Sequence, residues 1–149
     1  MNLYAESSAV LSWLFGEKRA ITVRLHLRSA SIILASDLTL VECERVIIRA
    51  RTLDEITDKR ARSCGGRLIN ASNQWHILRL GADVVGRARL PFPGEPIRTL
   101  DALHIASAII GRTAVPDLAL LSLDERIRFA AQQLGFVVLP KMITQPILR

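Results

Sequence analysis

Short runs of mostly hydrophobic residues alternate along the chain with longer segments in which hydrophobic residues recur at helical spacing. The short runs lie at residues 3–5, 31–35, 74–78, 118–121 and 136–139. Short hydrophobic runs bounded by polar or turn residues are typical of strands buried on both faces of a sheet. The pattern therefore predicts five strands.

The segments between these runs predict helices, because their hydrophobic residues recur every three or four positions. These helices are expected at about residues 8–15, 19–28, 37–51, 54–71, 81–89, 99–110 and 127–134. Ser8 and Thr99 are suitable N-cap residues, and the pair Gly65-Gly66 predicts a kink or break in the fourth helix. The alternation indicates an α/β fold: a single domain over 1–149, with a central parallel sheet of about five strands covered by helices on both faces and a C-terminal tail at 140–149.

One acidic residue, Asp101, opens the most hydrophobic of these helices. Acids are common in the first turn of a helix, where the dipole and the free amide groups favour them, so Asp101 alone needs no function. Three other acids have matching places: Glu6 follows the first strand, Glu42 lies early in the helix after the second strand, and Asp124 follows the fourth strand. Ligand sites in such sheets lie beyond the carboxyl ends of the strands, so all four acids are predicted to converge there.

Four carboxylates in one pocket repel each other and take up protons unless a cation neutralises them. Mg²⁺ and Mn²⁺ accept carboxylate oxygens and leave positions for water and for a phosphate oxygen. A water bound to such an ion is a better nucleophile, and the ion stabilises the charge that develops on a phosphodiester under attack. The cluster therefore predicts metal-dependent phosphodiester hydrolysis.

The charge balance is consistent with a nucleic-acid substrate. The chain of 149 residues carries 17 arginines and three lysines against 14 acidic residues, a net charge of +6. Arginine binds phosphate in a bidentate manner, although a solvated surface or a site for an acidic protein would have the same composition. No hydrophobic run approaches the roughly 20 residues of a membrane span, and Cys43 and Cys64 form no metal or redox motif. We expect a soluble, cytoplasmic protein with no membrane partner.

Four segments together resemble the PIN-domain nucleases, and the length is similar to that of a VapC-type toxin. The segments are YAESSAVL at 4–11, TLVECER at 39–45, TLDALHIASA at 99–108 and LSLDERI at 121–127. The resemblance implies that Glu6, Glu42, Asp101 and Asp124 are the catalytic, metal-binding acids. It also implies a Mg²⁺- or Mn²⁺-dependent ribonuclease with an RNA substrate, a homodimer and a cognate antitoxin protein.

The chain departs from this family at its first acid, where Glu6 stands in place of aspartate. Either the backbone after the first strand is retracted to compensate for the longer side chain, or the site binds Mg²⁺ weakly. The second outcome predicts Mn²⁺-favoured activity and a gain in Mg²⁺-supported cleavage for Glu6→Asp. Ser7 and Ser122 match supporting hydroxyl positions, although capping a helix explains Ser7 and Ser8 equally well. His104 lies one turn after Asp101, but a histidine in so hydrophobic a helix is usually a packing residue, so it is left out of the catalytic set.

Three other classes of protein compete with this interpretation. A nucleotide-binding domain lacks support because no glycine-rich loop follows the first strand. A phosphoacceptor receiver domain lacks its acceptor aspartate after the central strand. The remaining alternative is a PIN-like protein with weak catalysis that acts as an RNA- or partner-binding module.

Overall fold

The computed structural model describes residues 1–142, so the expected tail falls mostly outside the described residues. A single sheet of five parallel strands has the order β3-β2-β1-β4-β5. The strands are β1 (Asn2–Ala5), β2 (Ile32–Ser36), β3 (His76–Leu78), β4 (Leu118–Leu121) and β5 (Val138–Leu139). The helices are α1 (Ser7–Phe15), α2 (Ala20–Ser29), α3 (Asp37–Thr52), α4 (Asp58–Ser72), α5 (Ala82–Ala88), α6 (Thr99–Ala114) and α7 (Glu125–Gln133).

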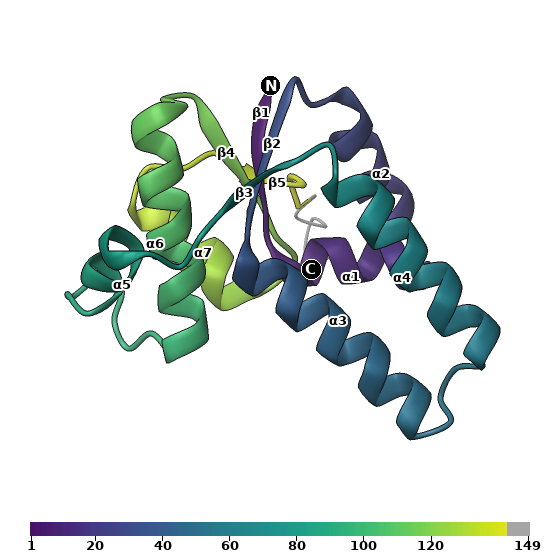
Figure 1. Cartoon of the computed structure of the whole chain (residues 1–149). Helices are drawn as coiled ribbons and strands as arrows, with labels where there is room; N and C mark the ends of the chain where they lie inside the picture. Colours follow the sequence, from purple (N-terminus) through teal and green to yellow (C-terminus); the bar gives the residue numbers. More distant parts are fainter. Residues whose placement is uncertain (143–149) are drawn as a thin grey trace, which may run out of the picture.

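Helices cover both faces of the sheet, as Figure 1 shows. The α5, α6 and α7 helices pack on one face against Tyr4, Leu34 and Leu120. The α1, α2, α3 and α4 helices pack on the other face, where strand residues such as Ala5 and Ala35 point. Successive strand residues alternate between the two faces, and both faces are hydrophobic, so the strands appear in the sequence as continuous runs. The predicted α/β architecture is confirmed.

Two predicted N-caps are wrong. Glu6, not Ser8, caps α1, because its carboxylate accepts a hydrogen bond from the Ser8 backbone amide at 3.1 Å. Arg98, not Thr99, is the N-cap residue of α6, and within residues 1–142 its side chain makes no capping hydrogen bond. The Glu6 side chain is long enough for its carboxylate to reach the Ser8 amide, one of the free amides at the start of the helix that an N-cap side chain usually contacts. Asp101 still lies in the first turn of α6, as predicted.

The predicted break at Gly65-Gly66 is also wrong, since α4 runs through both residues as one helix. Two glycines cost a helix about 1 kcal/mol each relative to alanine. Cys64 and Leu68, on either side of the pair, are buried against α1 and α3. Packing of this face outweighs the low helix propensity of the glycines.

The chain adds β2 and β3 on one side of β1, and then β4 and β5 on its other side. Neighbouring crossovers leave the sheet in opposite directions at such a point, so a crevice opens at the carboxyl ends of the strands. Glu6 follows β1 directly, and Ser122 follows β4. Within residues 1–142, no helix is long and hydrophobic enough to cross a membrane.

Candidate active site

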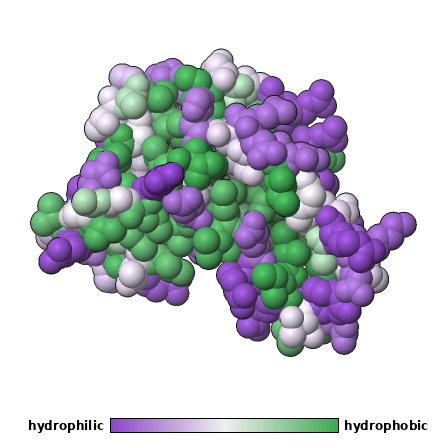
Figure 2. All heavy atoms as spheres, viewed as in Figure 1, coloured by the Kyte–Doolittle hydropathy of each residue, from purple (hydrophilic) through white to green (hydrophobic). Residues whose placement is uncertain are grey.

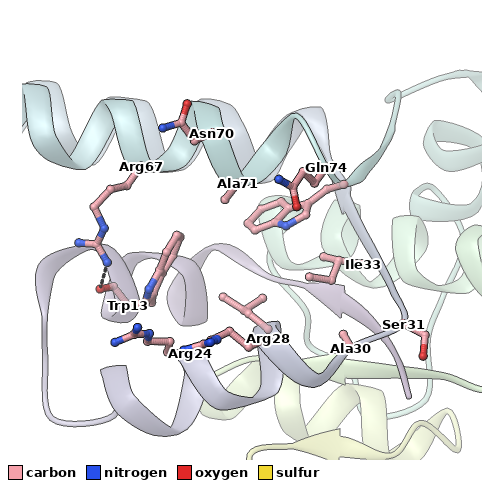
Figure 3. A pocket seen from close by; sticks show the side chains of 12 residues that line it. Trp13, Arg24, Arg28, Ala30, Ser31, Ile33, Arg67, Asn70, Ala71 and Gln74 are labelled. Atoms are coloured by element: carbon pink, nitrogen blue, oxygen red, sulfur yellow. Dashed lines mark hydrogen bonds between the residues drawn. The ribbon is translucent and has the colours of Figure 1, made fainter.

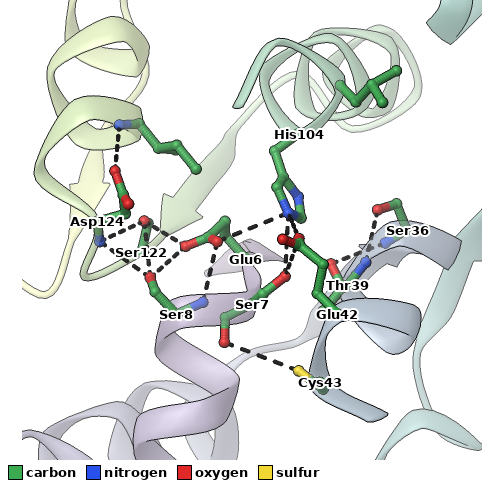
Figure 4. A network of polar contacts seen from close by, with 12 residues as sticks. Glu6, Ser7, Ser8, Ser36, Thr39, Glu42, Cys43, His104, Ser122 and Asp124 are labelled. Carbon is green, nitrogen blue, oxygen red and sulfur yellow. Dashed lines mark hydrogen bonds and ion pairs between the residues drawn. The ribbon is translucent and has the colours of Figure 1, made fainter. Parts of the chain in front are cut away.

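Glu6 lies in the crevice between β1 and β4 and is almost completely buried. One carboxylate oxygen accepts a hydrogen bond from Ser122 Oγ at 2.7 Å, and the Ser8 hydroxyl also donates to it. Ser8 Oγ in turn accepts from the backbone amides of Leu123 and Asp124 at 2.8 and 3.1 Å. The two hydroxyls therefore fix the Glu6 carboxylate and join the ends of β1 and β4 (Figure 4).

Glu42 approaches the same crevice from α3 and is half-buried. Ser7 Oγ donates to one of its carboxylate oxygens at 2.8 Å, and His104 Nε2 contacts the same oxygen. His104 Nε2 also lies 3.8 Å from the Glu6 carboxylate. Ligand atoms of Glu6, Glu42 and His104 all lie within 4.8 Å of one another, a spacing that suits a metal ion.

The His104 ring is held from its other side by Tyr4. His104 is 1% exposed, and its Nδ1 lies 3.1 Å from the Tyr4 hydroxyl. That hydroxyl donates to Ser36 Oγ at 3.0 Å, so its oxygen can accept a hydrogen bond from His104 Nδ1–H. Burial raises the pKa of Tyr4 to about 12, so the phenol keeps its proton. This contact orients the ring and leaves Nε2 directed toward the acids.

Asp101 and Asp124 lie outside this three-residue group but share its cleft. The cleft has a volume of about 770 Å³, and its lining includes all four predicted acids. The Asp124 side chain accepts hydrogen bonds from the backbone amides of Arg126 and Ile127, which makes it the N-cap of α7. Asp101 Oδ2 lies 3.7 Å from Arg98 Nε. The structure brings the four acids to one cleft, with Glu6 and Glu42 close together.

The charges of this cleft shift two acids in opposite directions. Burial, followed by the charge of Asp124, raises the pKa of Asp101, and the nearby Arg98 offsets only part of the rise. Burial also raises the pKa of Glu42, but hydrogen bonds from His104 and Ser7 outweigh it and leave the pKa below its ordinary value. The cleft keeps Glu42 ionised and destabilises the ionised form of Asp101. A cation would stabilise both carboxylates, so the cleft is suited to bind one.

Sequence reasoning missed His104, Ser8 and Tyr4 as parts of this site. The sequence predicts that His104 is a packing residue; in the structure it is buried, as predicted, but it also contacts two of the acids. Its contact with Glu42 joins residues 62 positions apart, so no local pattern in the sequence signals it. The position of Ser8 beside an acid was the available signal, but helix capping explained it equally well.

A second cavity, of about 660 Å³, lies at the amino-terminal end of β2 between α1, α2 and α4 (Figure 3). Trp13 and Trp75 line it together with three arginines, and the Arg67 guanidinium lies 4.7 Å from the centre of the Trp13 ring. Its described lining contains no carboxylate. This cavity is therefore unsuited to a metal ion.

Comparisons with known proteins agree with the fold. The sequence profile described as PIN domain matches residues 3–133. The structure resembles VapC20 of Mycobacterium tuberculosis, described as a sarcin-ricin loop cleaving toxin, with a TM-score of 0.63 and 16% identity over 91% of this chain and 96% of that chain. It also resembles a toxin–antitoxin complex from Klebsiella pneumoniae, with a TM-score of 0.64 and 18% identity over 96% and 100% of the two chains.

A third similar structure is VapBC2 from Rickettsia felis bound to a DNA fragment from their promoter. Its TM-score is 0.60 and its identity 12%, over 93% of this chain and 97% of that chain. Comparison with curated protein sequences gives no match. At these identities the solved structures share their fold with this chain, and its chemistry must be argued from its own residues.

Proposed function

The chain belongs to the PIN domain family, and on this basis we propose that it is a metal-dependent endoribonuclease and the toxin of a type II toxin–antitoxin pair. The observation that carries the proposal is the cleft at the carboxyl ends of β1 and β4, which is lined by four acids. Two of the similar folds belong to proteins described as a toxin or as part of a toxin–antitoxin complex. We further propose that the protein is cytoplasmic.

The residues of the cleft fit a divalent cation. Glu6, Glu42 and His104 offer three ligand atoms close together, and Asp101 and Asp124 complete the acidic lining. Carboxylate oxygens suit Mg²⁺ and Mn²⁺, and a nitrogen ligand favours the transition ion. When bound, the ion lowers the pKa of a water molecule and stabilises charge on the phosphate.

The protein groups around these ligands have positioning roles. Ser8 and Ser122 hold the Glu6 carboxylate, and Ser7 holds that of Glu42. Tyr4 sets the orientation of the His104 ring. Hydrogen bonds from outer groups keep ligands in the required geometry before the ion arrives.

Cleavage of mixed cellular RNA tests the proposal. Purified protein is incubated with RNA in Mg²⁺, in Mn²⁺ and in excess chelator, and the new RNA ends are sequenced. We expect discrete new ends with either metal and none with the chelator, because uncompensated acids repel the phosphate. Cleavage that is unaffected by the chelator would rule out the mechanism.

Replacing Glu6 by aspartate tests how the first acid is used. The contacts of Glu6 favour the opposite outcome from the one predicted from side-chain length, because the Ser122 and Ser8 hydroxyls hold the glutamate carboxylate. Shortening the side chain withdraws its oxygens by about 1.5 Å, and a displacement of about 1 Å can cost on the order of 10²-fold in rate. We expect slower cleavage by Glu6→Asp with both metals, measured as initial rates. Faster Mg²⁺-supported cleavage would restore the original expectation.

An antitoxin partner can inhibit the enzyme by placing an arginine or lysine in the cleft. The side chain would take the place of the cation beside Glu6 and Glu42, a charge-for-charge substitution that needs no change of fold. We expect an antitoxin variant in which this basic residue is replaced by glutamine to inhibit RNA cleavage much more weakly. Equal inhibition by the two antitoxins would exclude this mode.

We also propose a homodimer that includes the exposed hydrophobic side chains of α3. Val41, Val46 and Ile48 of α3, together with Leu53 directly after it, are each between 39% and 54% exposed. Figure 2 shows other hydrophobic residues gathered over the α5–α6 side, whereas the outer ends of α3 and α4 are mostly hydrophilic. Val46, Ile48 and Leu53 line one shallow hollow together with Arg45 and Arg49, and a hydrophobic patch rimmed by charged residues is typical of an interaction site.

One observation favours a binding protein without turnover. The Glu6 and Glu42 carboxylates already accept hydrogen bonds from hydroxyl groups, so a metal ion competes with internal partners. Titration with Mn²⁺ by calorimetry separates the two functions. Binding in the range used for the cleavage assay supports the enzyme, whereas RNA binding without Mn²⁺ uptake supports the binding module.

A further inference from the structure

A third hollow, of about 510 Å³ and distinct from the cavity beside Trp13, adjoins the acid cleft where the loop at residues 91–98 meets α7. The two hollows share Ile97, Arg98 and Asp101 as lining residues. A volume of several hundred cubic ångströms is typical of small-ligand sites. A chemical group bound in this hollow would therefore lie directly beside the residues that we propose to hold the metal ion.

The loop that forms one wall is held in a defined conformation. The Glu95 carboxylate accepts hydrogen bonds from the backbone amides of Phe92 and Ile97 at 3.0 and 2.7 Å. Phe92 is buried, and the Arg87 guanidinium lies 4.1 Å from the centre of its ring. These contacts fix the loop before any ligand binds, which reduces the entropy cost of binding.

Phe129 projects from α7 and forms part of the opposite wall. Its ring packs against Gly94, whose φ is +84° and where an added Cβ would lie 3.2 Å from Phe129 Cε1. The rest of the side chain is open, since Phe129 is 54% exposed. An exposed ring that is supported by backbone at one edge offers a flat face for stacking.

Charged groups of both signs surround this ring. Arg98 and Arg126 present guanidinium groups that bind phosphate. Glu125 presents a carboxylate, which can accept a hydrogen bond from an amino group of a base. A stacking face, phosphate donors and an acceptor for a base edge together match a nucleotide better than a simple anion or a hydrophobic peptide.

We propose that this hollow binds one nucleotide of the RNA next to the phosphate that is cleaved. The base stacks on Phe129, and Arg98 and Arg126 contact the neighbouring phosphates. The inference rests on the proposed function for its RNA substrate, and it adds the residues that position that substrate. Stacking tolerates any base, so Phe129 sets binding strength more than sequence preference.

Binding of a short fluorescent oligoadenylate, measured by anisotropy in the Asp101→Asn background, tests the inference without cleavage. We expect Phe129→Ala and Phe129→Leu to weaken binding about 10-fold and Phe129→Trp to retain it, because base stacking requires an aromatic face. Val137→Ala, at another hydrophobic residue that is 56% exposed, is the matched control and should bind as the parent does. Circular dichroism checks that each variant is folded.

The arginines are tested through salt dependence. Arg98→Gln and Arg126→Gln should each reduce the slope of log affinity against log salt by about one, as expected for one lost phosphate contact. Arg24→Gln, at an exposed arginine on α2, should leave the slope unchanged.

The outcomes separate this inference from the proposed nuclease activity. If the wild type cleaves RNA while Phe129→Ala, Phe129→Leu and Phe129→Trp all bind like the Val137→Ala control, the nucleotide site is wrong and the nuclease stands. If no metal supports cleavage but loss of the Phe129 ring weakens binding, the nucleotide site stands and the nuclease is wrong. Variants that weaken only the binding of an antitoxin would assign the hollow to that partner and overturn the inference.

Discussion

Replacing Asp101 by asparagine will abolish RNA cleavage while the fold remains intact. The amide has the shape of the carboxylate but lacks the charge that helps to hold a cation in the cleft. Metal stabilisation of the transition state is worth several kcal/mol, so the rate should fall on the order of 10³-fold or more. Initial rates with saturating Mn²⁺, compared with the wild type, measure the effect. A loss of less than tenfold would remove Asp101 from the catalytic set.

The metal-free Asp101→Asn protein should also be more stable than the wild type at neutral pH. Burial and the charge of Asp124 raise the folded-state pKa of Asp101. A carboxyl whose pKa is raised on folding costs stability once the pH rises above the unfolded value, and the full cost is present above the folded value. Asparagine lacks this cost, so the difference in Tm should shrink as the pH is lowered towards 4. If the variant is less stable than the wild type at pH 7, its loss of cleavage will be attributed to unfolding.

Replacing Arg128 by methionine should reduce the free energy of unfolding by about 3–5 kcal/mol. Arg128 is buried, and it donates to the carbonyl oxygens of Ser122, Leu139 and Pro140 at 2.8, 3.2 and 2.9 Å. Methionine has a similar volume but no donor, so the carbonyl groups of Ser122, Leu139 and Pro140 each lose one hydrogen bond, and that of Leu139 keeps the bond from the Ser122 amide at 3.0 Å. Urea denaturation of the metal-free protein measures the change.

The matched control for this prediction is Arg126→Met on the same helix. Arg126 is exposed, and only its backbone amide bonds to Asp124, so the substitution should change stability by less than about 0.5 kcal/mol. Equal stability of the two variants would show that the Arg128 hydrogen bonds contribute little. The Arg126 variant also measures how much the loss of one positive charge at an exposed position changes the free energy of unfolding.

The sequence was sufficient to predict the architecture because the strands are buried on both faces. Leu118–Leu121 is hydrophobic at each position and was predicted with its observed bounds. The last strand was predicted too long, at 136–139, whereas Val138–Leu139 pairs with β4. Strand ends depend on which neighbouring residues find partners, and this information is not local. Element ends are therefore less predictable than the elements themselves.

The site was predictable in its acids but not in the groups that hold them. Each acid lies just after a strand or within the first two turns of a helix, so topology alone brings all four to one edge of the sheet. The contacts of His104 with Glu42 and of Ser8 with Asp124 instead depend on packing between distant segments. The choice of Glu6 rather than Ser8 as the N-cap of α1 was equally open, because both residues can accept a hydrogen bond from an amide.

The central pairing of β1 with β4 has a consequence for synthesis of the protein on the ribosome. Ala5 pairs with Leu121, and the Glu6 amide donates to the Leu121 carbonyl at 3.0 Å. Glu6 and Asp124 therefore reach the same cleft only after segments from opposite ends of the chain have paired. Closing so long a loop is slow relative to local structure formation. A nascent chain that still holds residues 118–124 in the ribosomal exit tunnel lacks the partners of Glu6, so its acid cleft is incomplete. If the proposed function is correct, the ribosome therefore completes most of this chain before the chain can cleave any RNA, including the message that encodes it.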